Sequence, residues 1–108
     1  MSRPTFRNFE EFWPYYLGEH SDPMNRWLHF AGTSGFLALV IGTIFQANPW
    51  MVLFWPVAGY GPAWIGHFIV EKNRPATFQH PIWSLMGDFR MYGRMWQGRY
   101  WQGVADPA

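Results

Sequence analysis

All four histidines of this sequence lie near the two ends of one long uncharged segment. The segment, residues 27–70, contains no Asp, Glu, Lys or Arg and has Asn48-Pro49 near its middle. If it folds as two antiparallel helices that turn at Asn48-Pro49, the histidines on both sides of the turn meet at one end. These histidines are His20, His29, His67 and His80. Because imidazole is the commonest protein ligand for transition metals, this arrangement predicts a metal site.

Two further polar side chains stand at helical spacing from the histidines. Glu71 follows His67 by four positions, and Asn25 precedes His29 by the same spacing, so each pair shares one helix face. Two or three imidazoles with one carboxylate form the ligand type of non-haem Fe(II) oxygenases. The sequence has no cysteine, so no thiolate ligand is expected, and Fe(II), Mn(II) and Zn(II) are all chemically admissible. We therefore take the four histidines as candidate metal ligands, and Glu71 and Asn25 as candidate catalytic residues.

Each of these residues also has a structural interpretation. A single histidine near a helix end is more often hydrogen-bonded within the fold than bound to a metal. Glu71 could pair with Lys72 or Arg74, and Asn25 and Asn73 could cap helices or orient imidazoles. The grouping of all four histidines by topology favours metal binding over these alternatives.

The elements that would position these residues are expected to be helices. Residues 6–17 have the apolar spacing of a short amphipathic helix. Ser21-Asp22-Pro23 is a strong helix start, and a helix over residues 23–46 would carry about 30 Å of uncharged chain, enough to cross a bilayer. Residues 50–72 are long enough to cross again, but the prolines and glycines of residues 56–62 predict a kink or break there.

The C-terminal part completes a single domain over residues 1–108. Residues 81–101 form an amphipathic pattern whose Arg and Trp side chains suit the headgroup layer, and residues 103–108 are expected to be a tail. The predicted fold is therefore all-α: a transmembrane helical hairpin, its second helix kinked or broken, flanked by amphipathic interfacial helices. The alternative is a soluble helical bundle.

Composition agrees with a membrane protein. Aromatic residues make up 21% of the chain, and charged residues make up 14%, against about 25% in soluble domains. The net charge of +1 and the scattered basic residues predict no nucleic-acid partner. The positive-inside rule places both termini of a multi-pass protein in the cytoplasm. The basic residues that decide this are Lys72, Arg74, Arg90, Arg94 and Arg99. A two-span chain this small could enclose a polar site by forming a homo-oligomer.

Three segments of the sequence resemble a known family. They are EHSDPMNRWLHFAGT (residues 19–33), GYGPAWIGHFIVEKNRPATF (residues 59–78) and HPIWSLMGDFRM (residues 80–91). They are similar to the small membrane family that includes the 2-hydroxy fatty acid dioxygenase of fatty-acid α-oxidation, and the similarity covers roughly residues 6–100. Its most specific patterns are His-x4-Asn-x3-His (His20, Asn25, His29) and Gly-His-x3-Glu (Gly66, His67, Glu71).

The resemblance implies Fe(II)-dependent oxidation of a 2-hydroxy long-chain fatty acid by O2, giving an acid one carbon shorter. It implies that His20, His29 and His67 bind iron and that Glu71 is a ligand or supports one, while His80 lies outside both patterns. The implied partners are the lipid bilayer, a 2-hydroxy fatty acid or related lipid, and O2. The alkyl tail would lie in the apolar space near residues 56–62.

Two other functions fit the same residues. The histidines could serve structure or headgroup contact in a non-enzymatic, lipid-interacting membrane protein. They could also bind haem, because paired histidines on neighbouring helices are haem ligands. The sequence has no Gly-rich phosphate loop, GxSxG elbow or HExxH motif. The grouping of the histidines and the resemblance together favour an enzyme, and a metal-dependent dioxygenase is the function we expect first.

Overall fold

The computed structural model describes residues 5–101, and every regular element in this range is a helix. The α-helices are α1 (Phe9–Gly18), α2 (Pro23–Gln46), α3 (Trp55–Ile65) and α4 (Pro81–Trp96). Shorter segments join them: the 3-10 turns η1 (Pro49–Phe54) and η3 (Ala76–Phe78), and the π-helical segment η2 (Gly66–Glu71). The all-α class expected from the sequence is confirmed for the described residues.

Helix α2 is the longest element. Asp22 precedes it in an extended conformation, and the Asp22 side chain accepts a hydrogen bond from the Met24 N–H at 2.8 Å. Pro23 stands in the first turn, where no N–H partner is needed. The helix is followed by Ala47, which has a left-handed φ of 51°. Among the described residues, α2 is the one helix long and apolar enough to cross a membrane.

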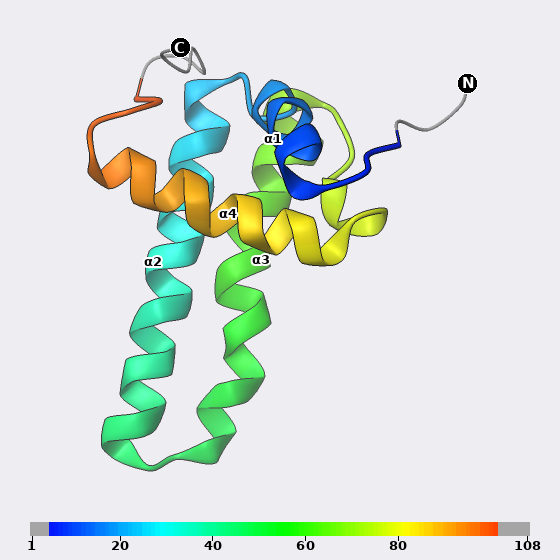
Figure 1. Ribbon diagram of the computed structural model, residues 1–108. Coiled ribbons are helices and arrows are strands. Elements are labelled where there is room, and N and C mark those ends of the chain that lie inside the picture. The colour runs from blue at the N-terminus through cyan, green and yellow to red at the C-terminus, as the bar shows by residue number, and fades with distance from the viewer. Residues whose placement is uncertain (1–4, 102–108) are drawn as a thin grey trace.

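Helix α3 returns alongside α2 after the turn (Figure 1). The two helices approach so closely that a Cβ atom on Gly32 would lie 2.6 Å from the backbone oxygen of Gly59. The prolines and glycines of residues 56–62 predict a kink or break in this helix. The backbone is α-helical from Trp55 to Ile65, and the helix type changes at the two ends of α3, from 3-10 to α and from α to π.

Helix α4 crosses the α2–α3 pair on one side, and α1 packs against it (Figure 1). The sequence pattern predicted a helix over residues 81–101, but α4 ends at Trp96. The chain turns at Gly98, whose φ of 86° is a conformation that glycine adopts without strain. The tail expected at residues 103–108 lies outside the described residues.

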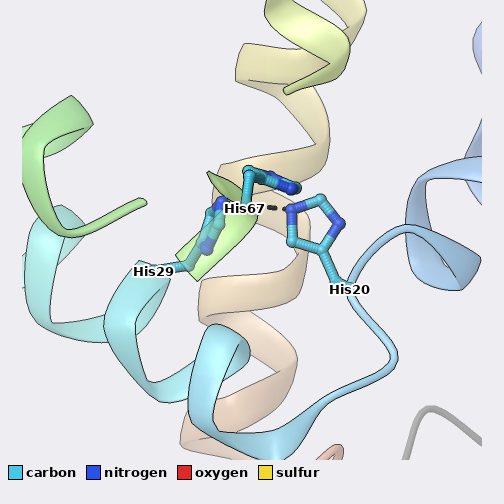
Figure 2. A group of neighbouring side chains, drawn as sticks. All are labelled: His20, His29 and His67. Atoms are coloured by element: carbon cyan, nitrogen blue, oxygen red, sulfur yellow. Dashed lines mark hydrogen bonds between the residues drawn. The ribbon is translucent and has the colours of Figure 1, made fainter. Parts of the chain in front are cut away.

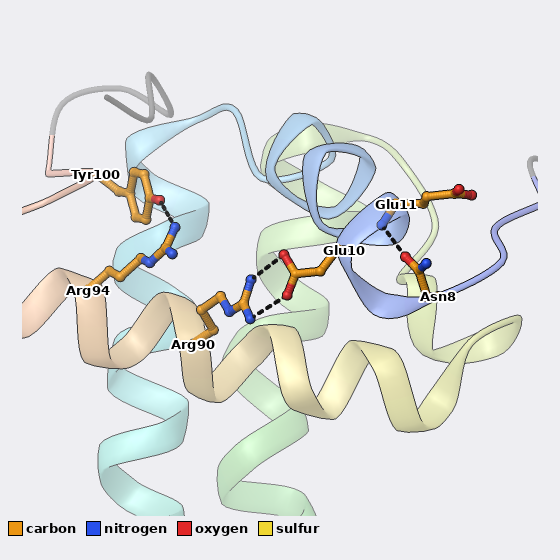
Figure 3. A network of polar contacts seen from close by, with 6 residues as sticks. All are labelled: Asn8, Glu10, Glu11, Arg90, Arg94 and Tyr100. Carbon is orange, nitrogen blue, oxygen red and sulfur yellow. Dashed lines mark hydrogen bonds and ion pairs between the residues drawn. The ribbon is translucent and has the colours of Figure 1, made fainter. Parts of the chain in front are cut away.

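Helix α1 begins at Phe9, inside the predicted range of residues 6–17. Asn8 stands before the helix, and its side chain accepts a hydrogen bond from the Glu11 N–H at 2.9 Å, as Figure 3 shows. This N-cap sets the start of the helix.

The main core lies between α1 and α4 and is largely aromatic. Its most buried side chains, each at most 1% exposed, are Phe12, Tyr16, Met91 and Met95. At the surface of the same contact, Arg90 donates to the two carboxylate oxygens of Glu10 at 2.9 and 3.3 Å (Figure 3). Exposed ion pairs contribute little to stability, so apolar packing is what holds α1 on α4.

Candidate metal centre

Three of the four histidines converge between the α1–α2 loop, α2 and η2, and their rings point toward one another in Figure 2. His20 lies in the loop before α2, His29 in the second turn of α2, and His67 in η2. Their side chains are 1%, 5% and 2% exposed, and one ring nitrogen of each lies within 4.8 Å of the others. The cavity beside them has a volume of about 10 Å³, which suits a single ion or water molecule.

The Nδ1 atoms of two of these imidazoles are held by backbone oxygens. His20 donates from Nδ1 to the oxygen of Tyr16 at 2.6 Å, and His29 donates from Nδ1 to the oxygen of Asn25 at 2.9 Å. A carbonyl oxygen can only accept, so both Nδ1 atoms carry the hydrogen. Each Nε2 therefore presents a lone pair, which is the form of imidazole that binds a metal.

The third imidazole is oriented by Asn73. His67 donates from Nδ1 to Oδ1 of Asn73 at 2.8 Å. The amide orientation follows from Glu19, because Nδ2 of Asn73 donates to the Glu19 backbone oxygen at 2.9 Å and to its carboxylate at 2.6 Å. Oδ1 of Asn73 must then face His67, which leaves a lone pair on Nε2 of His67 as well.

The spacing of the Nε2 atoms of His20 and His29 fits a shared cation. Nε2 of His20 lies 3.1 Å from Nε2 of His29, and two facing lone pairs at that distance repel unless a proton or a metal ion lies between them. Burial, followed by the neighbouring His29 and His67, lowers the pKa of His20, so a proton is disfavoured there. With metal–nitrogen bonds of about 2.1 Å, two nitrogens 3.1 Å apart would be able to bind the same ion, so His20 and His29 would hold it together.

Glu71 lies beside the site but points to the start of α2. One carboxylate oxygen accepts from the Asp22 N–H at 2.5 Å and from Nδ2 of Asn25 at 3.4 Å, and the other accepts from the Ser21 hydroxyl at 3.1 Å. Among the described residues, the group of converging ligand atoms consists of the three histidines without Glu71. Glu71 thus links η2 to the N-terminus of α2, where a negative charge is stabilised.

Asn25 is fully buried and fits against Gly66. A Cβ atom on Gly66 would lie 1.8 Å from Oδ1 of Asn25, so only glycine fits beside this side chain. The contact explains why the two sequence patterns contain Asn25 and Gly66: the amide of one motif occupies the space next to the backbone of the other. Asn25 also supplies the backbone oxygen that holds His29.

His80, predicted as a fourth ligand, lies outside the group of three converging histidines. Its ring packs against Phe6, Phe12 and Trp83, with centroid distances of 5.5, 5.3 and 5.4 Å. The residue directly precedes α4, where α4 begins its contact with α1, so its imidazole joins the aromatic core instead of the histidine cluster.

An apolar pocket of about 300 Å³ lies next to the histidines, between α2, α3 and α4. Phe36, Trp55 and Phe89 supply much of its wall. Two residues, Tyr60 and Asp88, line both this pocket and the small cavity at the histidines. Burial of the carboxyl group raises the pKa of Asp88 to about 7.

Asp88 is not among the site residues predicted from the sequence. A usable signal was present, because Asp88 is the one acidic residue in the amphipathic segment over residues 81–101. The apolar stripe of that segment predicts a face toward the headgroup layer, whereas Asp88 lies at the Tyr16 hydroxyl, which donates to its carboxylate.

Comparison with known proteins agrees with the resemblance drawn from the motifs. The model of a family described as 2-hydroxy-palmitic acid dioxygenase Mpo1-like matches residues 6–100. Comparisons with curated proteins and with solved structures give no match. The matched range includes all three converging histidines and covers nearly the whole chain. This protein therefore belongs to the Mpo1-like family.

Proposed function

We propose that this protein is a metal-dependent membrane dioxygenase that oxidises a 2-hydroxy long-chain fatty acid to the acid one carbon shorter. The observation that carries the proposal is the convergence of three buried imidazoles, each with its Nδ1 hydrogen engaged, beside a cavity of ionic size. The name of the family supports the reaction class. The oxidation balances as one 2-hydroxy acid and one O2 giving the shorter acid, CO2 and water.

His20, His29 and His67 would hold the metal, and Fe(II) is the ion that we propose, with Mn(II) or Zn(II) as chemically admissible substitutes. When bound, Fe(II) would supply O2 activation and coordination positions for the carboxylate and hydroxyl oxygens of the substrate. The chain itself fixes the ligands: the backbone oxygens of Tyr16 and Asn25 and the amide of Asn73 hold the three rings.

The apolar pocket would bind the alkyl chain of the substrate. Pro56, Gly59 and Tyr60 line it, in the region where the sequence analysis expected the tail. Since the pocket adjoins the histidine cavity at Tyr60 and Asp88, a fatty acid could place its head at the histidines and its chain among apolar side chains.

We further infer that α2, together with the returning η1–α3–η2 segment, inserts in the bilayer as a two-span hairpin, with both termini on the cytoplasmic side. Support comes from the large apolar side chains that stay exposed around the turn between α2 and α3. They include Ile44, Phe45, Trp50, Leu53 and Phe54, which are 59–83% exposed. Apolar surface of this extent marks a membrane or partner contact. A homo-oligomer in the membrane remains part of this proposal.

The geometry favours a bare metal ion over haem. Two axial imidazoles of a haem stand on opposite faces of the porphyrin, whereas His20 and His29 meet at 3.1 Å and are nearly perpendicular, with an interplanar angle of 81°. The cavity beside them, at about 10 Å³, has no room for a porphyrin.

The proposal is tested with protein purified anaerobically in mild detergent and supplied with Fe(II). We expect O2 consumption that depends on a 2-hydroxy fatty acid, with the one-carbon-shorter acid as product and no Soret absorption band. His29→Ala and His67→Ala should abolish product formation. A Soret band would support the haem alternative, and a protein that binds Fe(II) but oxidises no 2-hydroxy acid would contradict the dioxygenase assignment.

A further inference from the structure

Asp88 occupies the junction between the two cavities. It lies on α4 and lines both the small cavity at the histidines and the apolar pocket of about 300 Å³. The other residue shared by both walls is Tyr60 on α3. A ligand that extends from the histidines into the apolar pocket must therefore pass between α3 and α4 beside Asp88.

One oxygen of the Asp88 carboxyl group is already engaged. The Tyr16 hydroxyl donates a hydrogen bond to Oδ1 of Asp88. Among residues 5–101, no other hydrogen-bond donor reaches this carboxyl group, so Oδ2 retains its capacity to accept. Tyr16 also stacks on His20, with ring centroids 4.0 Å apart, which fixes the carboxyl group relative to the histidine cluster.

A carboxyl group is a costly choice at this position. Removing a polar group from water without giving it a hydrogen-bond partner costs free energy. The pocket wall around Asp88 is largely apolar and includes Phe36, Leu85 and Phe89. The bond from Tyr16 satisfies one oxygen, and the other is without a donor among the described residues, in a side chain that lines both cavities. A few polar groups placed in a mostly apolar pocket are typical of groups that orient a ligand.

We propose that Asp88 recognises the hydroxyl group of the ligand, by accepting its hydrogen at the junction of the histidine cavity and the apolar pocket. The ligand that fits has an anionic head at the histidines, a hydroxyl on the neighbouring carbon and an apolar chain. A ligand hydroxyl can donate a hydrogen to Oδ2 of Asp88, whereas a ligand carboxylate can only accept, so the hydroxyl is the group that faces Asp88. The inference rests on the proposed function in one respect, that the ligand spans both cavities.

The test measures binding without turnover. Zn(II)-loaded protein in lipid nanodiscs is titrated with a 2-hydroxy fatty acid and with the unsubstituted fatty acid of the same length. A buried acceptor that matches a ligand hydroxyl discriminates against the analogue that lacks it. We expect the wild-type protein to bind the hydroxy acid more tightly, and we expect Asp88→Ala to lower the ratio of the two dissociation constants about tenfold.

Tyr16→Phe is the matched control, because it removes the bond to Asp88 but keeps the carboxyl group. It should lower the ratio less than Asp88→Ala does, because the carboxyl group can still accept the hydrogen of the ligand hydroxyl. Asp88→Asn, which keeps the size of the side chain and an acceptor for Tyr16, should lower the ratio in the same direction and serves if Asp88→Ala does not fold.

Three results would overturn the inference. They are equal affinity of the wild-type protein for the two acids, an unchanged ratio of dissociation constants in both Asp88 variants, or a fall of this ratio in Tyr16→Phe as large as that in Asp88→Ala. The last result would mean that Asp88 only anchors Tyr16. This test and the test of the proposed function can fail independently of each other. An Asp88-dependent ratio without Fe(II)-dependent oxidation refutes the reaction alone, and oxidation with an unchanged ratio refutes the role of Asp88 alone.

Discussion

At the scale of single residues, the site depends on the atoms that hold the imidazoles. Each of the three rings donates its Nδ1 hydrogen to an oxygen that is itself fixed by helix geometry or by a second hydrogen bond. The rings therefore present their Nε2 atoms without having to reorganise when an ion arrives. Preorganisation of this kind is what partners of metal-binding histidines contribute to affinity.

Asn73→Ala should weaken metal binding by about 10- to 100-fold, because it removes the partner that orients His67. Competition between the protein and a Zn(II) chelator measures the change. Asn48→Ala is the matched control, since Asn48 caps η1 at the turn far from the histidines and its loss should leave Zn(II) affinity unchanged. Equal affinity of wild type and Asn73→Ala would show that His67 needs no such orientation.

At the scale of elements, η2 and α2 are joined by two contacts that lie next to the histidines. Gly66 accommodates the buried Asn25 side chain, and the Glu71 carboxylate accepts the Asp22 N–H at the start of α2. Gly66 and Glu71, which make these two contacts, and His67 all lie in the short π-helical segment η2. π-Helical turns are often found at functional sites, and this one lies at the candidate metal centre.

Gly66→Ala should destabilise the protein and lower its metal content, because the added Cβ would lie 1.8 Å from Oδ1 of Asn25. We expect a loss of about 1–3 kcal/mol, as for other overpacked cores, measured by thermal unfolding in detergent. Gly61→Ala on α3 has nothing within 4 Å of its added Cβ and should be neutral or stabilising by up to about 1 kcal/mol. A Gly66→Ala protein as stable as Gly61→Ala would refute the packing argument.

Local signals in the sequence were enough to locate α2 and the three histidines. Asp22-Pro23 is a cap followed by a helix start, and the turn signal at Asn48-Pro49 brings His29 and His67 to one end. The place of His80 could not be derived in this way, because it depends on how the segment after η2 returns to α1. That return is set by tertiary aromatic packing, which has no periodic signal.

The contacts made by Glu71 and Asp88 could not be predicted from the sequence for a related reason. Spacing of four residues correctly relates Glu71 to His67 along one segment, but the partners of its carboxylate come from the start of α2. Asp88 becomes a site residue only when α4 crosses the α2–α3 pair and turns its inner face to both cavities. Long-range packing decides both cases.

At the scale of the whole molecule, polar and apolar regions separate along the α2–α3 pair. Helix α1 lies toward one end of the pair and the turn between α2 and α3 at the other (Figure 1). The ion pair between Arg90 of α4 and Glu10 of α1 belongs to the first end, whereas the turn carries exposed apolar side chains such as Phe45 and Trp50. Helix α2, at about 1.5 Å per residue over 24 residues, is about 36 Å long. This length suits the thickness of a bilayer.

The two-span hairpin predicts opposite accessibility of its two ends, and the absence of native cysteine makes single-cysteine labelling clean. In sealed vesicles, a membrane-impermeant maleimide should label Glu11→Cys on α1 from one side and Asn48→Cys at the turn from the other side. Labelling of both positions from the same side would contradict the two-span arrangement. Protection of Asn48→Cys from both sides would mean that the turn ends inside the bilayer.

The most direct test of the central claim is a metal count on four single histidine variants. Wild type, His20→Ala, His29→Ala, His67→Ala and the control His80→Ala are titrated with Co(II), and bound metal per chain is measured by elemental analysis at each free Co(II) concentration, which gives both stoichiometry and affinity. The structure predicts about one Co(II) per chain for wild type and for His80→Ala, and loss of at least about tenfold in affinity for each of the other three. A His67→Ala or His29→Ala protein that keeps wild-type Co(II) affinity, or a His80→Ala protein that loses it while remaining folded, would contradict the three-histidine centre.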